Sequence, residues 1–252
     1  MTTKRQRVSI RSKSETVLAA LVFTGIGSLA GLLGATIPGM AGFVAATTSD
    51  AVYIVSSRGV QFGFGVFALG YLSYTGSWDR YARFRRPGLR DVGAVLGAFL
   101  ALLAVGYVVN AVVGLLGLPH EVTTGTTEHS LALHAQPRLW PLAFLAWFAF
   151  ATPAEELFYR GLVQTRLRDA FPATTVVVLA GACFALSHAS FAALSGASGT
   201  ALAATFIELL GAGIVFGALY EVTDNLATVA IFHGLTWLEL AHTVERIVAT
   251  VL

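Results

Sequence analysis

Long apolar stretches alternate with short polar segments along almost the whole chain. An apolar stretch of about 20 residues with few charges is typical of a helix that crosses a membrane. The second stretch is short and rich in glycine and phenylalanine, and an eighth span would fit within 40–57. The pattern predicts an all-α, polytopic transmembrane helical bundle of about seven to eight spans, seven of which lie at about 17–38, 59–75, 92–116, 139–159, 173–193, 201–221 and 226–249.

The composition agrees with this pattern. Of the 252 residues, 56% are hydrophobic and 12% are charged, whereas a soluble domain carries roughly twice that share of charge. We therefore expect a multi-pass integral membrane protein, with a basic N-terminal segment at 1–16 and a single transmembrane bundle at 17–252. The apolar run after the basic segment is longer than the ~7–15 residues of a signal-peptide core, so we expect it to be retained; cleavage is the alternative.

Lysine and arginine are distributed unequally between the two sides of this topology. With the N-terminus in the cytoplasm, 13 of the 16 fall on the cytoplasmic side, and the exceptions are Arg58, Arg138 and Arg246. Such a bias is typical of proteins in a cell membrane. Because the basic residues flank spans, the sequence predicts contact with the lipid bilayer and no nucleic-acid partner. Cys183 is the only cysteine, which excludes an internal disulfide.

Ionisable side chains lie inside three late spans, where each costs at least ~2.5–3.5 kcal/mol near a helix centre and usually marks function. The first span carries two adjacent glutamates with an arginine after them, and each of the other two carries a histidine. The residues are Glu155, Glu156, Arg160, His188 and His233.

The spacing of the first group predicts a division of labour between the glutamates. Glu156 and Arg160 are four residues apart, so they share a helix face and form a structural pair. Glu155 points about 100° away and is left as a free carboxylate that suits a general base. Alternatively, both glutamates lie at a helix end and are solvated. Asn225 is expected to cap the last helix.

Two glutamates and two histidines on three spans can converge on one water molecule in two ways. Glu155, His188 and His233 hold a divalent metal that activates the water. Alternatively, Glu155 deprotonates the water directly with the aid of His188, while His233 donates to the developing oxyanion. Each histidine taken alone is as well explained as a packing residue. Straight helices with the predicted bounds place Glu155, His233 and His188 at unequal depths of roughly 8, 12 and 20 Å, which does not fit a shared water.

The ordered motifs EExxxR, FxxxH and Asn-Leu before a final histidine resemble the CPBP intramembrane proteases. This family, also called CAAX or Abi proteases, includes relatives of the CAAX prenyl endopeptidases and bacterial proteins linked to bacteriocin processing and immunity. The resemblance covers about 150–240, within a catalytic core at about 139–249. The first 140 residues match the family only in being hydrophobic.

The resemblance implies a function and a role for each motif residue. It implies an intramembrane endopeptidase acting on a membrane-associated, in some members prenylated, peptide. Glu155 falls on the catalytic glutamate, Glu156 and Arg160 on the structural pair, and His188 and His233 on the catalytic histidines. Because members are commonly described as metalloproteases, a divalent metal such as zinc at Glu155, His188 and His233 is also implied.

One position departs from the family pattern. The last motif of the family reads HxxxN, but Trp237 stands four residues after His233. An indole donates one hydrogen bond and offers no oxygen ligand, which puts metal binding and full activity in doubt unless Glu239 and His242 compensate. A non-catalytic immunity or binding protein on the same fold is therefore the alternative function. A proton-coupled transporter is a third possibility, against which the absence of an internal repeat counts.

Overall fold

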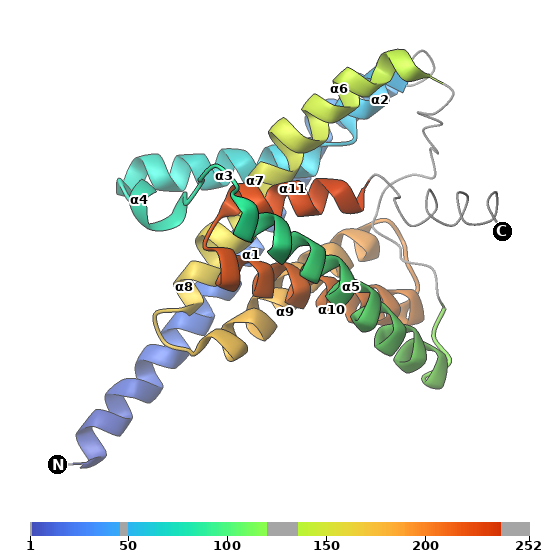
Figure 1. Cartoon of the computed structure of the whole chain (residues 1–252). Coiled ribbons are helices and arrows are strands. Elements are labelled where there is room, and N and C mark those ends of the chain that lie inside the picture. Colours follow the sequence, from blue (N-terminus) through green and yellow to red (C-terminus); the bar gives the residue numbers. More distant parts are fainter. Residues whose placement is uncertain (1, 46–49, 120–135, 238–252) are drawn as a thin grey trace.

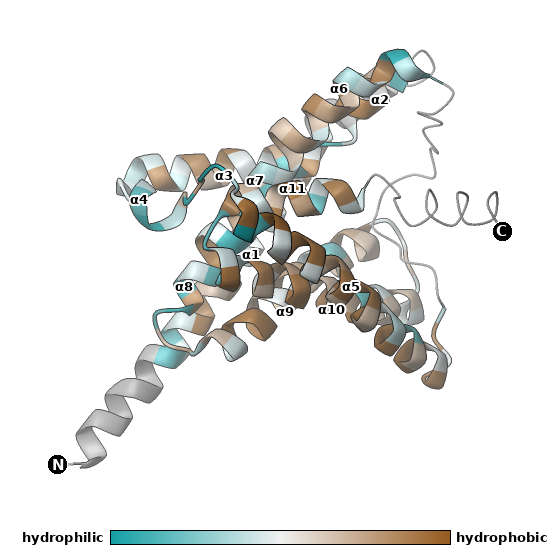
Figure 2. Ribbon diagram, in the orientation of Figure 1, coloured by the Kyte–Doolittle hydropathy of each residue, from teal (hydrophilic) through white to brown (hydrophobic). Residues whose placement is uncertain are grey.

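The computed structural model describes residues 2–45, 50–119 and 136–237, and all regular structure in these ranges is helical (Figure 1). Four helices are long and apolar enough to cross a membrane: the Lys13–Thr36 part of α1 (Thr2–Ala45), α5 (Leu89–Leu115), α9 (Ala173–Leu194) and α10 (Gly199–Thr223). Their bounds agree with four predicted spans to within a few residues, and apolar residues dominate their surfaces (Figure 2). The predicted all-α membrane bundle is confirmed.

The second predicted span is the second, longer part of an interrupted helix. The short helix α2 (Asp50–Ser56) leads through Ser57 and Arg58 into α3 (Gly59–Thr75), which has the predicted bounds. Residues 40–57 do not form a separate eighth helix in the described part of the chain, because α1 continues to Ala45 and α2 is only seven residues long. The last predicted span begins as α11 (Leu226–Thr236), and its remainder, 238–249, lies outside the described residues.

The fourth predicted span belongs to a longer, continuous helix whose winding changes along its length. It begins with the 3₁₀ turn η2 and ends with α8, eight residues beyond the predicted boundary at 159. Pro153 lacks an amide hydrogen and lies in the first turn of the short α-helical segment that separates the two π-helical segments. Such segments frequently occur at functional sites. The order is η2 (Pro137–Leu139), α6 (Trp140–Phe144), η3 (Leu145–Ala151), α7 (Thr152–Glu156), η4 (Leu157–Gln164) and α8 (Thr165–Leu167).

Glycines allow two helix pairs to approach closely. A Cβ atom at Gly63 of α3 would lie 1.9 Å from the carbonyl oxygen of Ala30 in α1. A Cβ atom at Gly213 of α10 would lie 2.8 Å from the Cα atom of Gly181 in α9. Small residues at such crossings bring helix backbones into direct contact, which drives helix association in membranes.

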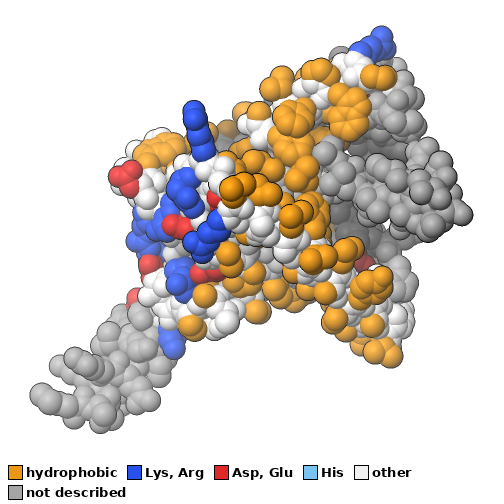
Figure 3. Space-filling view, in the orientation of Figure 1, with side chains coloured by type: hydrophobic (Ala, Val, Ile, Leu, Met, Phe, Trp, Pro, Cys, Tyr) orange, Lys and Arg blue, Asp and Glu red, His pale blue; other side chains and the backbone are white. Residues whose placement is uncertain are grey.

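Charged residues gather at one end of the bundle, around α4 (Trp78–Tyr81) and α8 (Figure 3). Arg80 pairs with Asp169 at 2.5 Å, and Arg83 pairs with Asp224 at 2.6 Å. These contacts join segments that the predicted topology assigns to the same side of the membrane. That this side is cytoplasmic remains a prediction.

The last helix begins beside the middle of the glutamate-bearing helix. The amide of Leu226 donates to the carbonyl of Arg83 at 2.9 Å, and its side chain approaches Gly161 in the middle of η4. Asn225 accepts a hydrogen bond from the amide of Ala227 at 3.2 Å, which confirms the predicted cap. From this start, next to the Arg83–Asp224 pair, α11 runs alongside η4 and α7.

Candidate active site

Glu155 and His188 form a buried pair between α7 and α9. The Nε2 atom of His188 lies 3.3 Å from Oε1 of Glu155, and Glu155 is 1% exposed. The Nδ1 atom of His188 lies 2.9 Å from the carbonyl oxygen of Phe184, one turn earlier in the same helix. This backbone contact fixes the direction of the ring and leaves Nε2 facing the carboxylate.

The hydrogen bonds determine how many protons this pair holds. A carbonyl oxygen only accepts, so Nδ1 of His188 carries a hydrogen. In a neutral imidazole Nε2 would then present a lone pair to the Glu155 carboxylate, which is repulsive. The contact is attractive when one proton is available between Nε2 and Oε1. Glu155 and His188 therefore form an ion pair that holds one exchangeable proton, at a contact that does not meet hydrogen-bond geometry.

Glu156 is the centre of a second buried group. Arg160 contacts its Oε2 at 3.1 Å, and His233 of α11 contacts its Oε1 through Nδ1 at 2.7 Å. The other end of the guanidinium donates to the carbonyl of Gly213 at 3.4 Å. All three side chains of the group are at least 95% buried. Glu156 thus fixes both the arginine and the histidine ring, whose Nε2 atom points away from it.

The structure brings the five sequence-predicted residues together as two neighbouring groups. Glu155 contacts His188, whereas His233 contacts Glu156. The two histidines reach adjacent glutamates because the helix that bears the glutamates continues to Leu167 and because α11 begins beside Gly161 of that helix. Phe184 lies between the groups, with its ring centre 4.4 Å from that of His188 and 6.5 Å from that of His233.

The donor set bears on the expected metal. Among residues 2–45, 50–119 and 136–237, no three His, Cys, Asp or Glu side chains are arranged to hold one ion. The described residues therefore do not fit a metal centre formed by Glu155, His188 and His233, and we derive no step through one. Glu239 and His242 lie outside the described residues, and zinc stays an untested expectation.

Trp237 stands beside His233 where the family has asparagine. The two ring centres are 4.9 Å apart at an angle of 74°, so the indole packs edge-on against the imidazole. The guanidinium of Arg58 lies 4.9 Å from the centre of the Trp237 ring, and Trp147 packs edge-on against the same indole. These contacts hold the indole against His233.

Gln61 of α3 also reaches the site, and sequence analysis missed it. Its Nε2 atom donates to Oε2 of Glu155 at 3.1 Å. The packing of α3 on α7 sets this register, because a Cβ atom at Gly65 would lie 3.2 Å from that of Ala154. The signal available in the sequence was a single amide side chain within the first turn of an otherwise apolar span.

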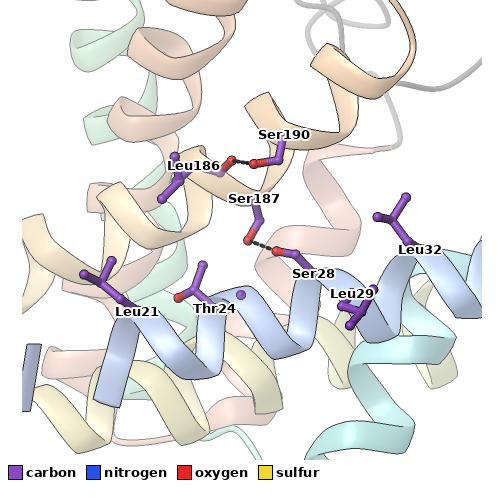
Figure 4. A pocket seen from close by; sticks show the side chains of 9 residues that line it. Leu21, Thr24, Ser28, Leu29, Leu32, Leu186, Ser187 and Ser190 are labelled. Atoms are coloured by element: carbon purple, nitrogen blue, oxygen red, sulfur yellow. Dashed lines mark hydrogen bonds between the residues drawn. The ribbon is translucent and has the colours of Figure 1, made fainter. Parts of the chain in front are cut away.

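A separate cavity of about 430 Å³ opens between α1 and α9 (Figure 4). Four of its nine lining residues are leucines and the rest are small residues, and a hydrogen bond of 2.8 Å between Ser28 and Ser187 joins the two helices. Ser187 precedes His188 in the chain, but neither Glu155 nor His188 lines the cavity. It is therefore adjacent to the buried pair and distinct from it.

Comparison with known proteins gives one match. Residues 137–238 match the family model described as Type II CAAX prenyl endopeptidase Rce1-like. These residues contain all five predicted site residues and Trp237, and they exclude Gln61. The comparisons with curated proteins and with solved structures gave no match.

Proposed function

Since residues 137–238 belong to the CPBP/CAAX protease family, we propose that the protein is an intramembrane endopeptidase that cleaves a membrane-associated peptide. The observation that carries the proposal is the buried Glu155–His188 pair between membrane helices. A buried carboxylate that shares a proton with an imidazole is a suitable acceptor and donor for the two proton transfers of peptide hydrolysis.

Glu155 is the general base in the proposed reaction. As the water oxygen bonds to the scissile carbonyl carbon, one water proton passes to Glu155 and the carbonyl π electrons move to its oxygen. When the carbonyl re-forms, the C–N bond breaks and the proton passes to the leaving amine. His188 stays hydrogen-bonded to Phe184 and stabilises the carboxylate through Nε2. The reaction yields a carboxylic acid and an amine, which become a carboxylate and an ammonium ion when the remaining water proton passes between them, and the Glu155–His188 pair returns to its starting protonation.

His233 is the proposed donor to the tetrahedral oxyanion. Its Nδ1–H donates to Glu156 at 2.7 Å, so Nε2 is the nitrogen that can face a substrate. In the doubly protonated ring Nε2–H donates to an oxyanion, and Glu156 stabilises the positive charge from the other side. Arg160 contacts the other oxygen of the Glu156 carboxylate and keeps that carboxylate in place. Glu156 and Arg160 are thus structural, and His233 acts on the substrate.

The proposed substrate class is a peptide anchored in the bilayer, such as the C-terminal segment of a prenylated protein. The matched family description names a prenyl endopeptidase, and the described bundle presents extensive apolar surface (Figure 3). A substrate delivered within the membrane reaches a site between spanning helices without first entering water.

The test is cleavage of a quenched fluorescent peptide that ends in an S-farnesyl-cysteine CAAX sequence, with the purified protein in proteoliposomes. We expect Glu155→Gln to reduce the rate of cleavage by at least about 100-fold, because glutamine keeps the shape of the side chain but cannot accept a proton from water. Glu221→Gln is the matched control, since it makes the same change at a glutamate of α10 whose carboxylate contacts Gln164 and Arg168 and not the site. Unchanged cleavage by the Glu155→Gln variant would refute the mechanism.

Trp237 favours one second candidate, a non-catalytic membrane binding or immunity protein. Its indole occupies the position of the family asparagine and packs directly on His233. This candidate predicts that the native protein does not cleave the peptide and that Trp237→Asn creates activity. Cleavage by the native protein, lost in Glu155→Gln, would exclude it.

A further inference from the structure

The orientation of the Gln61 side-chain amide is determined by its partner. A carboxylate has only acceptor oxygens, so the atom of Gln61 that lies 3.1 Å from Glu155 Oε2 must be the NH₂ nitrogen. The carbonyl oxygen, Oε1, is bonded to the same carbon and therefore lies within a few ångströms of the Glu155 carboxylate. The partner thus fixes which amide atom is the nitrogen and which is the oxygen.

Two acceptor oxygens at this point have no hydrogen-bond donor among the described residues. They are Oε1 of Gln61 and Oε1 of Glu155, both of which are buried. The approach of His188 Nε2 to Glu155 Oε1 is an ion-pair contact without hydrogen-bond alignment, and it leaves a lone pair of that oxygen unused. Buried acceptors are normally paired, and an unpaired one in a native protein calls for an explanation.

We propose that Gln61 is a further catalytic residue, whose Oε1 holds the nucleophilic water together with Glu155. Water has two O–H donors, and the two neighbouring oxygens supply one acceptor for each. A water that donates to both directs a lone pair away from them, toward a substrate carbonyl. The inference rests on the proposed function, because it assigns a position to the water which that function requires.

The proposed contacts persist through the first step of the reaction. One hydrogen of the water passes to Glu155 while the oxygen bonds to the scissile carbon. The other hydrogen stays on the new hydroxyl group of the tetrahedral intermediate and continues to be donated to Gln61. No further reactant is needed, and the amide is unchanged at the end.

Packing of α3 against the matched family region holds Gln61 in this position. Phe64, in the next turn of α3, stacks on Phe158 with ring centres 4.8 Å apart. The close approach of Gly65 to Ala154 fixes the height of α3 against α7. Because α3 lies outside residues 137–238, the site is completed by a part of the chain that the family match does not cover.

The experiment compares Gln61→Met with Gln164→Met in the farnesyl-peptide assay. Methionine keeps the length of glutamine and removes both hydrogen bonds. Gln164 is a matched control because it is a buried glutamine that binds the carbonyl of Gly217 and not the site. We expect Gln61→Met to lower kcat by about 100-fold with little change in KM, the size of effect seen when one positioned hydrogen bond to a reacting group is lost. Gln164→Met is expected to keep kcat.

A second measurement reports on the contact without cleavage. The infrared carboxylate band that disappears in Glu155→Gln belongs to Glu155, and Gln61→Met should shift that band because Oε2 loses its donor. Native-like thermal unfolding of Gln61→Met would show that the variant is folded.

The outcomes separate failure of this inference from failure of the proposed function. Cleavage that is lost in Glu155→Gln but kept in Gln61→Met overturns the role of Gln61 alone. If Gln61→Met raises KM and leaves kcat unchanged, Gln61 Oε1 binds an N–H group of the substrate and not the water. That result also overturns the proposed role of Gln61. If the Glu155 carboxylate band does not shift in Gln61→Met, the hydrogen bond between Gln61 and Glu155 is absent, and the proposed role of Gln61 fails. If the native protein does not cleave at all, the proposed function fails and the role of Gln61 fails with it.

Discussion

Replacing Arg160 with methionine should destabilise the bundle strongly. Arg160 and Glu156 are 1% and 0% exposed, and their charged atoms are 3.1 Å apart. Breaking a buried pair by removing one partner costs about 3–5 kcal/mol, because the remaining charge is left uncompensated. The guanidinium also lies 5.0 Å from the Phe184 ring and 5.2 Å from the Phe216 ring, each a contact of about 0.5–2 kcal/mol. We expect a loss in unfolding free energy of about 4 kcal/mol.

The assay is reversible unfolding by SDS in mixed micelles, followed by circular dichroism. Arg166→Met is the matched control, because Arg166 forms an ion pair with Asp169 but is 39% exposed. A surface pair contributes about 0–1 kcal/mol, so this control should lose little stability. The difference between the two variants isolates the effect of burial.

A double mutant tests the cause. In Glu156→Gln/Arg160→Met no unpaired charge is left between the helices, so we expect it to be more stable than Arg160→Met alone. A coupling energy of about 2 kcal/mol or more would fit a direct buried pair. A loss below about 1 kcal/mol for Arg160→Met, or strict additivity of the two changes, would refute this reasoning.

Three further predictions concern packing, capping and metal content. Gly213→Leu should cost about 1–3 kcal/mol or more in the same unfolding assay, because its Cβ atom would lie 2.8 Å from Gly181, whereas Gly97→Leu meets nothing within 4 Å and should be tolerated. Asn225→Ala should lower stability by about 1 kcal/mol through loss of the α11 cap, measured by thermal unfolding. Mass spectrometry of the purified protein should find no stoichiometric metal if Glu155 acts directly. About one zinc per chain, lost in His188→Ala/His233→Ala, would instead support a metalloprotease.

Span positions could be predicted from the sequence because they depend on local composition. The bounds of α5, α9 and α10 follow from uninterrupted apolar runs between polar segments. The fourth predicted span ends at 159, whereas the glutamate-bearing helix continues to Leu167. The i, i+4 spacing predicts the pair of Glu156 and Arg160, but local composition does not show that the pair is buried: in the folded protein Arg160 is 1% exposed. A charge that is paired inside the bundle does not end a helix.

The partners within the site depend on contacts between distant segments. The i, i+4 spacing of Glu156 and Arg160 predicts their contact, since both lie on one helix. His233 contacts Glu156, and this contact depends on the position at which α11 begins. A hydrogen bond between Leu226 and Arg83, which are far apart in the chain, holds that position. Gln61 is 94 residues from Glu155 and reaches it through helix packing that no local pattern encodes.

Charge balance explains why two adjacent glutamates can lie among membrane helices. Glu156 and Arg160 neutralise each other, and Glu155 and His188 are neutral together when they share one proton. These two neutral pairs remove most of the cost of burying their charges. In the doubly protonated form that the proposed oxyanion donor requires, His233 adds one positive charge, which lies against the Glu156 carboxylate. When Glu155 takes a proton from water in the proposed reaction, a positive charge arises on the pair and a negative one on the substrate oxygen. These two charges disappear together as the proton passes to the leaving amine, so the net charge within the bundle does not change during the reaction.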